Sequence, residues 1–183
     1  PSRSWASGSS SSSGPKPRRS NRCTTRCLMR VTRASISATV GRVGAGSDAQ
    51  WDELFDSNAR APFFLSQAAA PHLRERHGSI VNIADIFGQV PKPQHTVYCM
   101  AKAALIMMTR SLAIELAPEV RVNAIAPGAI LWPESGKPDA EKDAIVQATP
   151  LRRMGDVDDI CQTAVWLIEQ AKFSTGQVIA VDG

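Results

Sequence analysis

The chain has 183 residues, of which 43% are hydrophobic, and a net charge of +4. This length and apolar content suit one domain with a sizeable core, and four cysteines are too few for a small disulfide-stabilised scaffold. The charge is uneven, because residues 1–47 carry nine Lys or Arg and no acidic residue, whereas residues 48–183 have a net charge of −5. A protein that binds nucleic acid over its whole surface is therefore not expected.

Residues 1–47 are predicted to be a basic, disordered segment, and residues 48–183 to form the folded part. Eleven of the first 38 residues are Ser and seven are Arg, so too little apolar surface is available to offset the entropy of ordering. The same composition is typical of an organelle transit peptide, and a misjoined start of the chain would also explain it. Because we find no secretory signal and no apolar run near the ~20 residues that span a bilayer, we expect a cytoplasmic protein without membrane contact.

The first folded element is predicted to be a helix over residues 49–70, capped by Asp48. Pro71 is expected near the end of this helix, with one further helical turn over residues 72–77. Residues 79–84 are apolar and partly β-branched, which is typical of a buried strand. The apolar face of the first helix is expected to comprise Trp51, Leu54, Phe55, Phe63, Phe64 and Leu65.

The rest of the chain alternates between helices and strands. Loops are predicted over residues 87–96 and 129–137, where Pro and Gly are frequent. Strands separated by helices of these lengths predict an α/β fold, a Rossmann-like parallel sheet with crossover helices. The predicted helices cover residues 97–116, 139–147 and 157–170, and the predicted strands cover residues 121–126 and 177–181.

Tyr98, the single tyrosine, lies four residues before Lys102 near the start of a predicted helix. Residues at this spacing share one helix face. A nearby ammonium and the helix N-terminus both favour a phenolate, so we expect the pKa of Tyr98 to fall toward neutral pH. Such a phenol can donate or accept a proton, and the preceding buried strand places it where parallel sheets bind ligands.

Five parts of the chain together resemble the short-chain dehydrogenase/reductases. They are Asn58 and residues 81–83, 98–102, 121–128 and 175–183, in the order and spacing of that family. The resemblance implies that Asn58, Tyr98 and Lys102 are catalytic, with Asn58 supporting a water chain to Lys102. It also implies that Tyr98 and Lys102 contact a nicotinamide cofactor, with Lys102 holding the ribose hydroxyls.

The resemblance further implies where the cofactor lies and how subunits associate. Pro127, Gly128 and Ile130 correspond to the part of the family that meets the nicotinamide carboxamide. A homodimer or homotetramer is expected through the helices predicted at residues 49–70 and 97–116. We expect no metal site, because the three histidines lack ligand partners at useful spacing.

Asp85 departs from the family pattern, which has a Ser thirteen residues before the Tyr. A carboxylate there would repel the negative charge that develops on a ketone oxygen, and it suits a ring N–H instead. Asp85, together with residues 127–134, resembles the pteridine reductases. This resemblance implies reduction of pterin or dihydrofolate rings with NADPH. Trp132 is then a candidate for stacking on the substrate. The alternative is a generic carbonyl or alcohol oxidoreductase using NADPH or NADH.

A second departure concerns the pyrophosphate of the cofactor. The family begins with a strand and a glycine-rich turn, but Gly41, Gly44 and Gly46 follow no apolar strand. The fold is therefore expected to be N-terminally incomplete. A truncated, non-catalytic chain remains a further hypothesis, and a truncated sheet would be poorly soluble.

Overall fold

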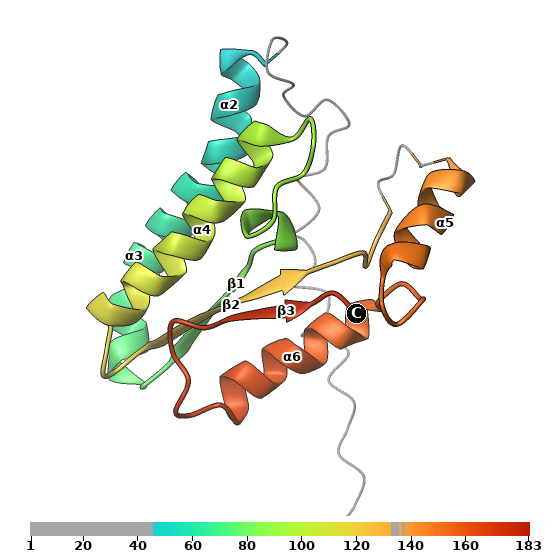
Figure 1. Ribbon diagram of the computed structural model, residues 1–183. Helices are drawn as coiled ribbons and strands as arrows, with labels where there is room; N and C mark the ends of the chain where they lie inside the picture. The colour runs from blue at the N-terminus through green and yellow to red at the C-terminus, as the bar shows by residue number, and fades with distance from the viewer. Residues whose placement is uncertain (1–45, 133–135, 137) are drawn as a thin grey trace, which may run out of the picture.

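The computed structural model describes residues 46–132, 136 and 138–183, which form a parallel sheet covered by helices on both faces (Figure 1). The three strands are β1 (Ser79–Ile83), β2 (Arg121–Pro127) and β3 (Val178–Val181), in the order β1-β2-β3. Both neighbouring pairs are parallel. The predicted Rossmann-like α/β architecture is confirmed. Of the segment 1–47 predicted to be disordered, residues 1–45 lie outside the described part of the chain, and Ser47 caps the first helix.

Helices precede the sheet and connect its strands. Apart from the first helix, the helices begin and end within one or two residues of the predicted bounds. A 3-10 turn, η3, overlaps the start of the stretch predicted as a loop. The helical elements are α2 (Asp48–Phe55), η2 (Asp56–Arg60), α3 (Ala61–Glu75), η3 (Ile86–Gly88), α4 (Thr96–Glu115), α5 (Asp139–Ala148) and α6 (Val157–Glu169).

The first helix differs from the prediction at its N-terminus, whereas the helical turn predicted after Pro71 is present. Ser47, not Asp48, is the N-cap: its side chain accepts from Gln50 N–H at 3.3 Å, and the Gln50 side chain accepts from Ser47 N–H at 3.3 Å. This capping box makes Asp48 the first helical residue. The helix also continues past Pro71 to Glu75. Pro71 is exposed, so water can satisfy the carbonyl group that loses its helical donor.

The predicted apolar face of this helix is largely wrong. Phe63, Phe64 and Leu65 are 40%, 55% and 69% exposed. Three consecutive residues point about 100° apart around a helix and cannot share one face. The buried positions of α3 are instead taken by Ser66 and Ala70.

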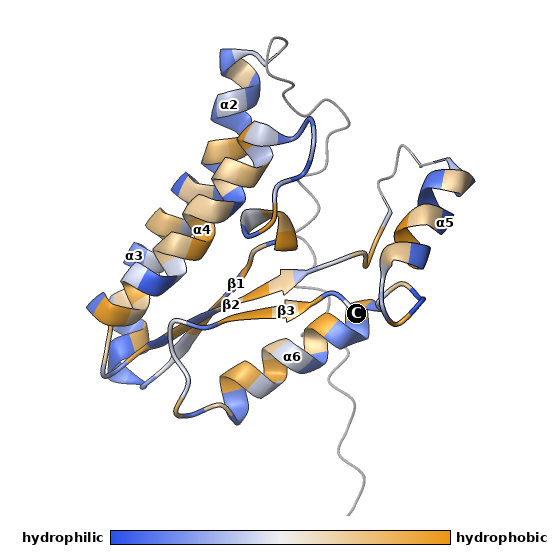
Figure 2. Ribbon diagram, viewed as in Figure 1, coloured by the Kyte–Doolittle hydropathy of each residue, from blue (hydrophilic) through white to orange (hydrophobic). Residues whose placement is uncertain are grey.

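The core lies on both faces of the sheet, and the strands and α4 carry mostly hydrophobic residues (Figure 2). On the α4 face, two clusters contain Ala70, Ala84, Leu105, Ile106, Leu112, Ala113, Leu116, Val120, Val122 and Ala124. On the α6 face, one cluster contains Ile125, Ala164, Leu167 and Ala171, with Val81, Ile83, Ile160, Ile179 and Val181 packed against it. The middle strand β2 contributes buried residues to both faces.

The two crossover connections have opposite hands. The chain moves in one direction from β1 to β2 to β3, yet α4 covers one face and α6 the other. Parallel crossovers are right-handed in nearly all proteins, so one of these two departs from the rule. The result is a middle strand held between helices on both sides (Figure 1).

The expectation that no segment is long and apolar enough to span a bilayer is corrected at α4. This helix is long and apolar enough to cross a membrane by length and composition, whereas no such run was expected from the sequence. Eight of its residues are buried inside the protein. Its apolar composition therefore matches its position as the central helix on one face of the sheet.

Candidate functional site

Asp85 and Tyr98 meet at the carboxyl end of β1. The Tyr98 hydroxyl donates to Asp85 Oδ2 at 2.6 Å. The other oxygen, Oδ1, accepts from Phe87 N–H at 2.9 Å and so caps η3. The structure thus brings the two predicted residues together, and it gives each carboxylate oxygen a separate partner.

Lys102 lies one helical turn after Tyr98 and is also buried, with 6% of its surface exposed. Its Nζ donates to the carbonyl oxygens of Ile83 and Ala84, each at 3.3 Å. The ammonium also lies 5.8 Å from the centre of the Tyr98 ring. Lys102 therefore ties α4 to the end of β1, beside the Asp85–Tyr98 pair.

The expected direction of the Tyr98 pKa is wrong for this arrangement. Burial raises the pKa of Tyr98, and the charge and hydrogen bond of Asp85 raise it further. Both effects favour the neutral phenol, because the carboxylate accepts its proton. Burial also lowers the pKa of Lys102, and the opposite charge of Asp85 only partly offsets this. The described residues therefore hold the phenol protonated.

Asn58 sits in the π-helical segment η2 and is 3% exposed. Its Nδ2 donates to the carbonyl oxygen of Leu54 at 2.9 Å and to Ser57 Oγ at 3.1 Å. The segment η2 packs against α4, the helix that carries Tyr98 and Lys102. Single π turns inside helices are frequent at functional sites. The catalytic role predicted for Asn58 stays a prediction, and its placement beside α4 is compatible with it.

Pro127 and Gly128 lie where β2 ends. Gly128 N–H donates to the Val181 carbonyl at 3.0 Å, and a Cβ on Gly128 would lie 2.8 Å from Asp182 Cα. Only glycine allows the two strand ends to approach so closely. Ile130 follows, and it lines a pocket of about 560 Å³ beyond the ends of β2 and β3. That pocket is lined by other residues than Asp85, Tyr98 and Lys102.

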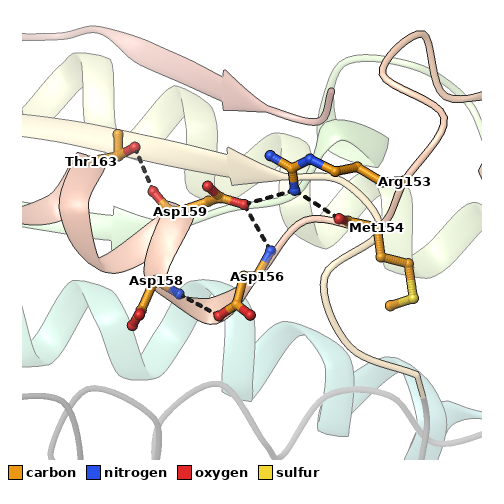
Figure 3. Close-up of polar contacts among 6 residues, drawn as sticks. All are labelled: Arg153, Met154, Asp156, Asp158, Asp159 and Thr163. Atoms are coloured by element: carbon orange, nitrogen blue, oxygen red, sulfur yellow. Dashed lines mark hydrogen bonds and ion pairs between the residues drawn. The ribbon is translucent and has the colours of Figure 1, made fainter.

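A set of hydrogen bonds at the start of α6 forms one side of this pocket (Figure 3). Arg153 Nη1 lies 3.4 Å from Asp159 Oδ2 and donates to the Met154 carbonyl at 2.9 Å. The same Asp159 oxygen accepts from Asp156 N–H at 2.8 Å. The Asp156 N–H group, followed by Arg153, holds the pKa of Asp159 below its usual value. The Arg153 guanidinium is thus already engaged by an anion and a carbonyl.

Trp132 is half-buried at the end of the described stretch 46–132. The following residues 133–135 lie outside the described part of the chain. The structure does not bring Trp132 into the pocket beside Ile130. Its role as a wall for a flat substrate stays a prediction.

Two contacts near the site were not predicted from the sequence. Asn82, inside an apolar strand, donates to Thr109 Oγ1 on α4 at 2.9 Å, and both side chains are buried. Gly88 presses against the main chain of Lys102. A polar residue inside a buried strand was the available signal for the first contact. A single glycine in a loop gave no signal for the second.

The described residues supply a hydrogen-bond acceptor, a protonated phenol and a buried cation at one edge of the sheet. A carboxylate at Asp85 accepts hydrogen bonds and cannot donate them unless it is protonated. The arrangement suits a partner that presents an N–H or O–H group to Asp85. It suits less well a bare carbonyl oxygen, which needs a donor at this place.

This chain is similar to a protein-family model and to curated proteins over most of its length. Residues 29–183 match a family model described as Enoyl-(Acyl carrier protein) reductase. Nodulation protein G of Rhizobium sp. (strain N33) is 39% identical over 141 residues, which are 75% of this chain and 58% of that protein. The 3-oxoacyl-[acyl-carrier-protein] reductase FabG of Thermotoga maritima is 36% identical over 137 residues, 73% of this chain and 56% of that protein.

A solved structure shows the same fold. The 4-hydroxyisoleucine dehydrogenase complexed with NADH aligns with a TM-score of 0.72 and 32% identity, over 82% of this chain and 65% of that one. The chain therefore spans somewhat more than half the length of the curated relatives it matches.

Proposed function

The chain belongs to the short-chain dehydrogenase/reductase family, and on that premise we propose that its protein reduces a pterin or dihydrofolate ring with a nicotinamide cofactor. The main support for this proposal is the 2.6 Å hydrogen bond from the Tyr98 hydroxyl to Asp85. It puts an acceptor where reduction of a ketone calls for a donor. Pterin rings present N–H groups, which pair with a carboxylate.

The roles of the chain's own residues follow from their contacts. Asp85 binds the ring N–H groups and fixes the orientation of Tyr98. Tyr98, held protonated by burial and by Asp85, is the proton donor to the reduced ring. Lys102 keeps α4 against β1 through the Ile83 and Ala84 carbonyls. Asn58 is proposed to support the water chain that returns protons to Lys102.

A nicotinamide cofactor, when bound, supplies the hydride. An ammonium has three N–H donors, so Lys102 keeps one beyond its two carbonyl contacts, and this donor suits a ribose hydroxyl. Pro127, Gly128 and Ile130 are the proposed nicotinamide contacts. Residues 46–132, 136 and 138–183 include no glycine-rich turn after a strand for the pyrophosphate, so the contacts proposed from these residues cover only the nicotinamide half. NADPH is the proposed cofactor, and NADH is the alternative.

A second candidate is reduction of a carbonyl compound. It is favoured by the relatives, one of which is named as a 3-oxoacyl-[acyl-carrier-protein] reductase and another as a dehydrogenase. Asp85 is the residue that separates the two candidates, because a carbonyl oxygen would meet its carboxylate.

The two candidates can be separated by measuring NADPH oxidation with dihydrobiopterin, dihydrofolate and a simple ketone. We expect turnover of the pterins by the unchanged protein. Asp85→Ser should reduce pterin turnover and leave or improve ketone turnover. Asp85→Asn, of nearly the same shape, removes the charge and turns one acceptor oxygen into an NH2 donor, so it should also reduce pterin turnover. Ketone turnover without pterin turnover in the unchanged protein would contradict the proposal. Calorimetry with NADPH tests the non-catalytic hypothesis separately, since that hypothesis predicts no binding.

We also propose that a second copy of the protein covers the exposed apolar residues of α3 and α4, as the family resemblance implies. These residues are Phe63, Phe64, Leu65, Met100, Met107 and Ile114. The three residues on α4 recur every seven positions and so share one helix face, which is typical of an association surface. The three consecutive residues on α3 point in different directions, so only part of them can join that surface. Sedimentation of the protein should give a dimer or tetramer, and Phe64→Glu should shift it toward the monomer.

A further inference from the structure

We infer that Gly88 is a positioning residue: its lack of a side chain lets the turn after β1 close on the main chain of Lys102, and this closure holds Asp85 against Tyr98. The inference concerns the site of the proposed function, but it rests on contacts alone and is tested without substrate or cofactor.

The space around Gly88 leaves no room for even a methyl group. A Cβ there would lie 2.7 Å from Ile106 Cδ1, 2.9 Å from the Lys102 carbonyl carbon and 3.0 Å from the Lys102 carbonyl oxygen. Carbon atoms in contact are ordinarily about 3.5 to 4.0 Å apart. The Ile106 side chain can rotate away, but the Lys102 carbonyl belongs to the hydrogen-bonded backbone of α4. An added methyl group must therefore move the turn.

Movement of the turn is transmitted directly to Asp85. The main chain of η3 is closed by Gly88 N–H, which donates to the Asp85 carbonyl at 3.0 Å. Phe87 N–H donates to Asp85 Oδ1 at 2.9 Å, while Oδ2 accepts from Tyr98 at 2.6 Å. A bond between two oxygens is at the long end of its range by about 3.0 Å. A displacement of a few tenths of an ångström is thus enough to weaken it.

Tyr98 reports on this contact without ambiguity, because it is the only tyrosine among the 183 residues. The groups that act on its ionisation are Asp85 on the turn and Cys99 on the same helix, with the Lys102 ammonium 5.8 Å from its ring. A hydrogen bond to a charged group changes a pKa by about one to two pH units. Losing the bond to Asp85 would therefore let Tyr98 ionise at lower pH.

The test compares Gly88→Ala with the unchanged 183-residue chain by tyrosinate absorbance and by the single 13Cζ resonance of labelled tyrosine. We expect the resonance at neutral pH to shift in Gly88→Ala, and tyrosinate to appear at lower pH than in the unchanged chain. The matched control is Gly78→Ala, whose Cβ would first meet the end of the Leu73 side chain, at 2.6 Å from Cδ2, rather than a main-chain atom. A folded Gly88→Ala protein with the titration and resonance of the unchanged chain would overturn the inference.

A second variant removes the side-chain part of the collision. Ile106→Val deletes the Cδ1 atom, so in Gly88→Ala/Ile106→Val only the Lys102 main chain opposes the new methyl group. We expect the Tyr98 titration to stay displaced in this double variant. Full return to the behaviour of the unchanged chain would overturn the role of the Lys102 main chain. Unfolding of both variants would also overturn the inference, because Gly88 would then be needed for the fold as a whole.

Discussion

The two faces of the sheet use polar side chains in different ways. On the α6 side, Arg121 donates to the carbonyl oxygens of Leu167, Ile168 and Ala171 at 2.7 to 2.9 Å and so closes the end of the helix. On the α4 side, polar side chains bind one another, as Asn82 does with Thr109. The first pattern satisfies main-chain groups that any helix end leaves free. The second pattern fixes side-chain positions, which is what a site for chemistry requires.

The largest expected effect is on the α4 side. Tyr98→Phe keeps the buried ring and removes the hydroxyl that donates to Asp85. Loss of a proton donor lowers the rate of the chemical step by about 10²- to 10⁴-fold. The measurement is kcat for NADPH oxidation with whichever of dihydrobiopterin, dihydrofolate or the ketone the unchanged protein reduces, and circular dichroism checks the fold. A fall of less than tenfold would mean that Tyr98 is not the proton donor.

The next largest effect is expected on the α6 side, where a substitution should lower stability without changing kcat. Leu167 is fully buried in the apolar cluster with Ile125. Leu167→Ala should lower the free energy of unfolding by about 2 to 5 kcal/mol, because it removes apolar contacts and leaves a cavity. Urea denaturation measures the change. The kcat per folded molecule should stay the same, and a large drop in kcat would show that the two faces are not independent.

A smaller loss is expected at the polar contact between β1 and α4. Thr109→Val leaves the Asn82 amide buried without its acceptor, which costs about 1 to 3 kcal/mol. The double variant Asn82→Val/Thr109→Val removes both polar groups, so it should be more stable than the single variant. If urea denaturation finds the double variant less stable, the contact is not the reason for the loss.

The smallest effect appears only at alkaline pH. The pKa of Tyr98 is raised above 10.0 in the folded protein, so the unfolded chain loses this proton first. Stability from this group is complete below pH 10 and falls as the pH rises above it, by about 1.4 kcal/mol at pH 11. Tyr98→Phe lacks this dependence. The difference in unfolding free energy between the two proteins should therefore change by that amount between pH 9 and pH 11.

The strands could be predicted closely because their sequences are short apolar runs, partly β-branched and bounded by polar or turn residues. The strands β1, β2 and β3 begin and end within a residue of the predicted bounds, since buried parallel strands have continuous apolar runs. The π-helical segment at Asn58 could not be predicted. It depends on where neighbouring helices pack, and one inserted residue leaves little trace in an apolar pattern.

The residues of the candidate site could be predicted from the sequence, but the direction of the Tyr98 pKa shift could not. Asp85, Tyr98 and Lys102 do come together. The pKa of Tyr98 moves in the opposite direction, because helical spacing says that Lys102 is near but not that its ammonium donates to main-chain carbonyls. Burial and the contact with Asp85 then decide the direction. Both depend on packing between segments distant in the sequence.

The register of the sheet also has a consequence for the rate of folding. Ser79 pairs with Arg121 and Ala124 with Val178, so no strand pair can form from a local hairpin. Chains whose contacts join residues far apart in sequence fold slowly, whereas an isolated helix such as α4 forms within about a microsecond. The helices should therefore be present long before β2 acquires its neighbours. Until then, the strand edges remain open to other chains, and dilution should improve the yield of refolding.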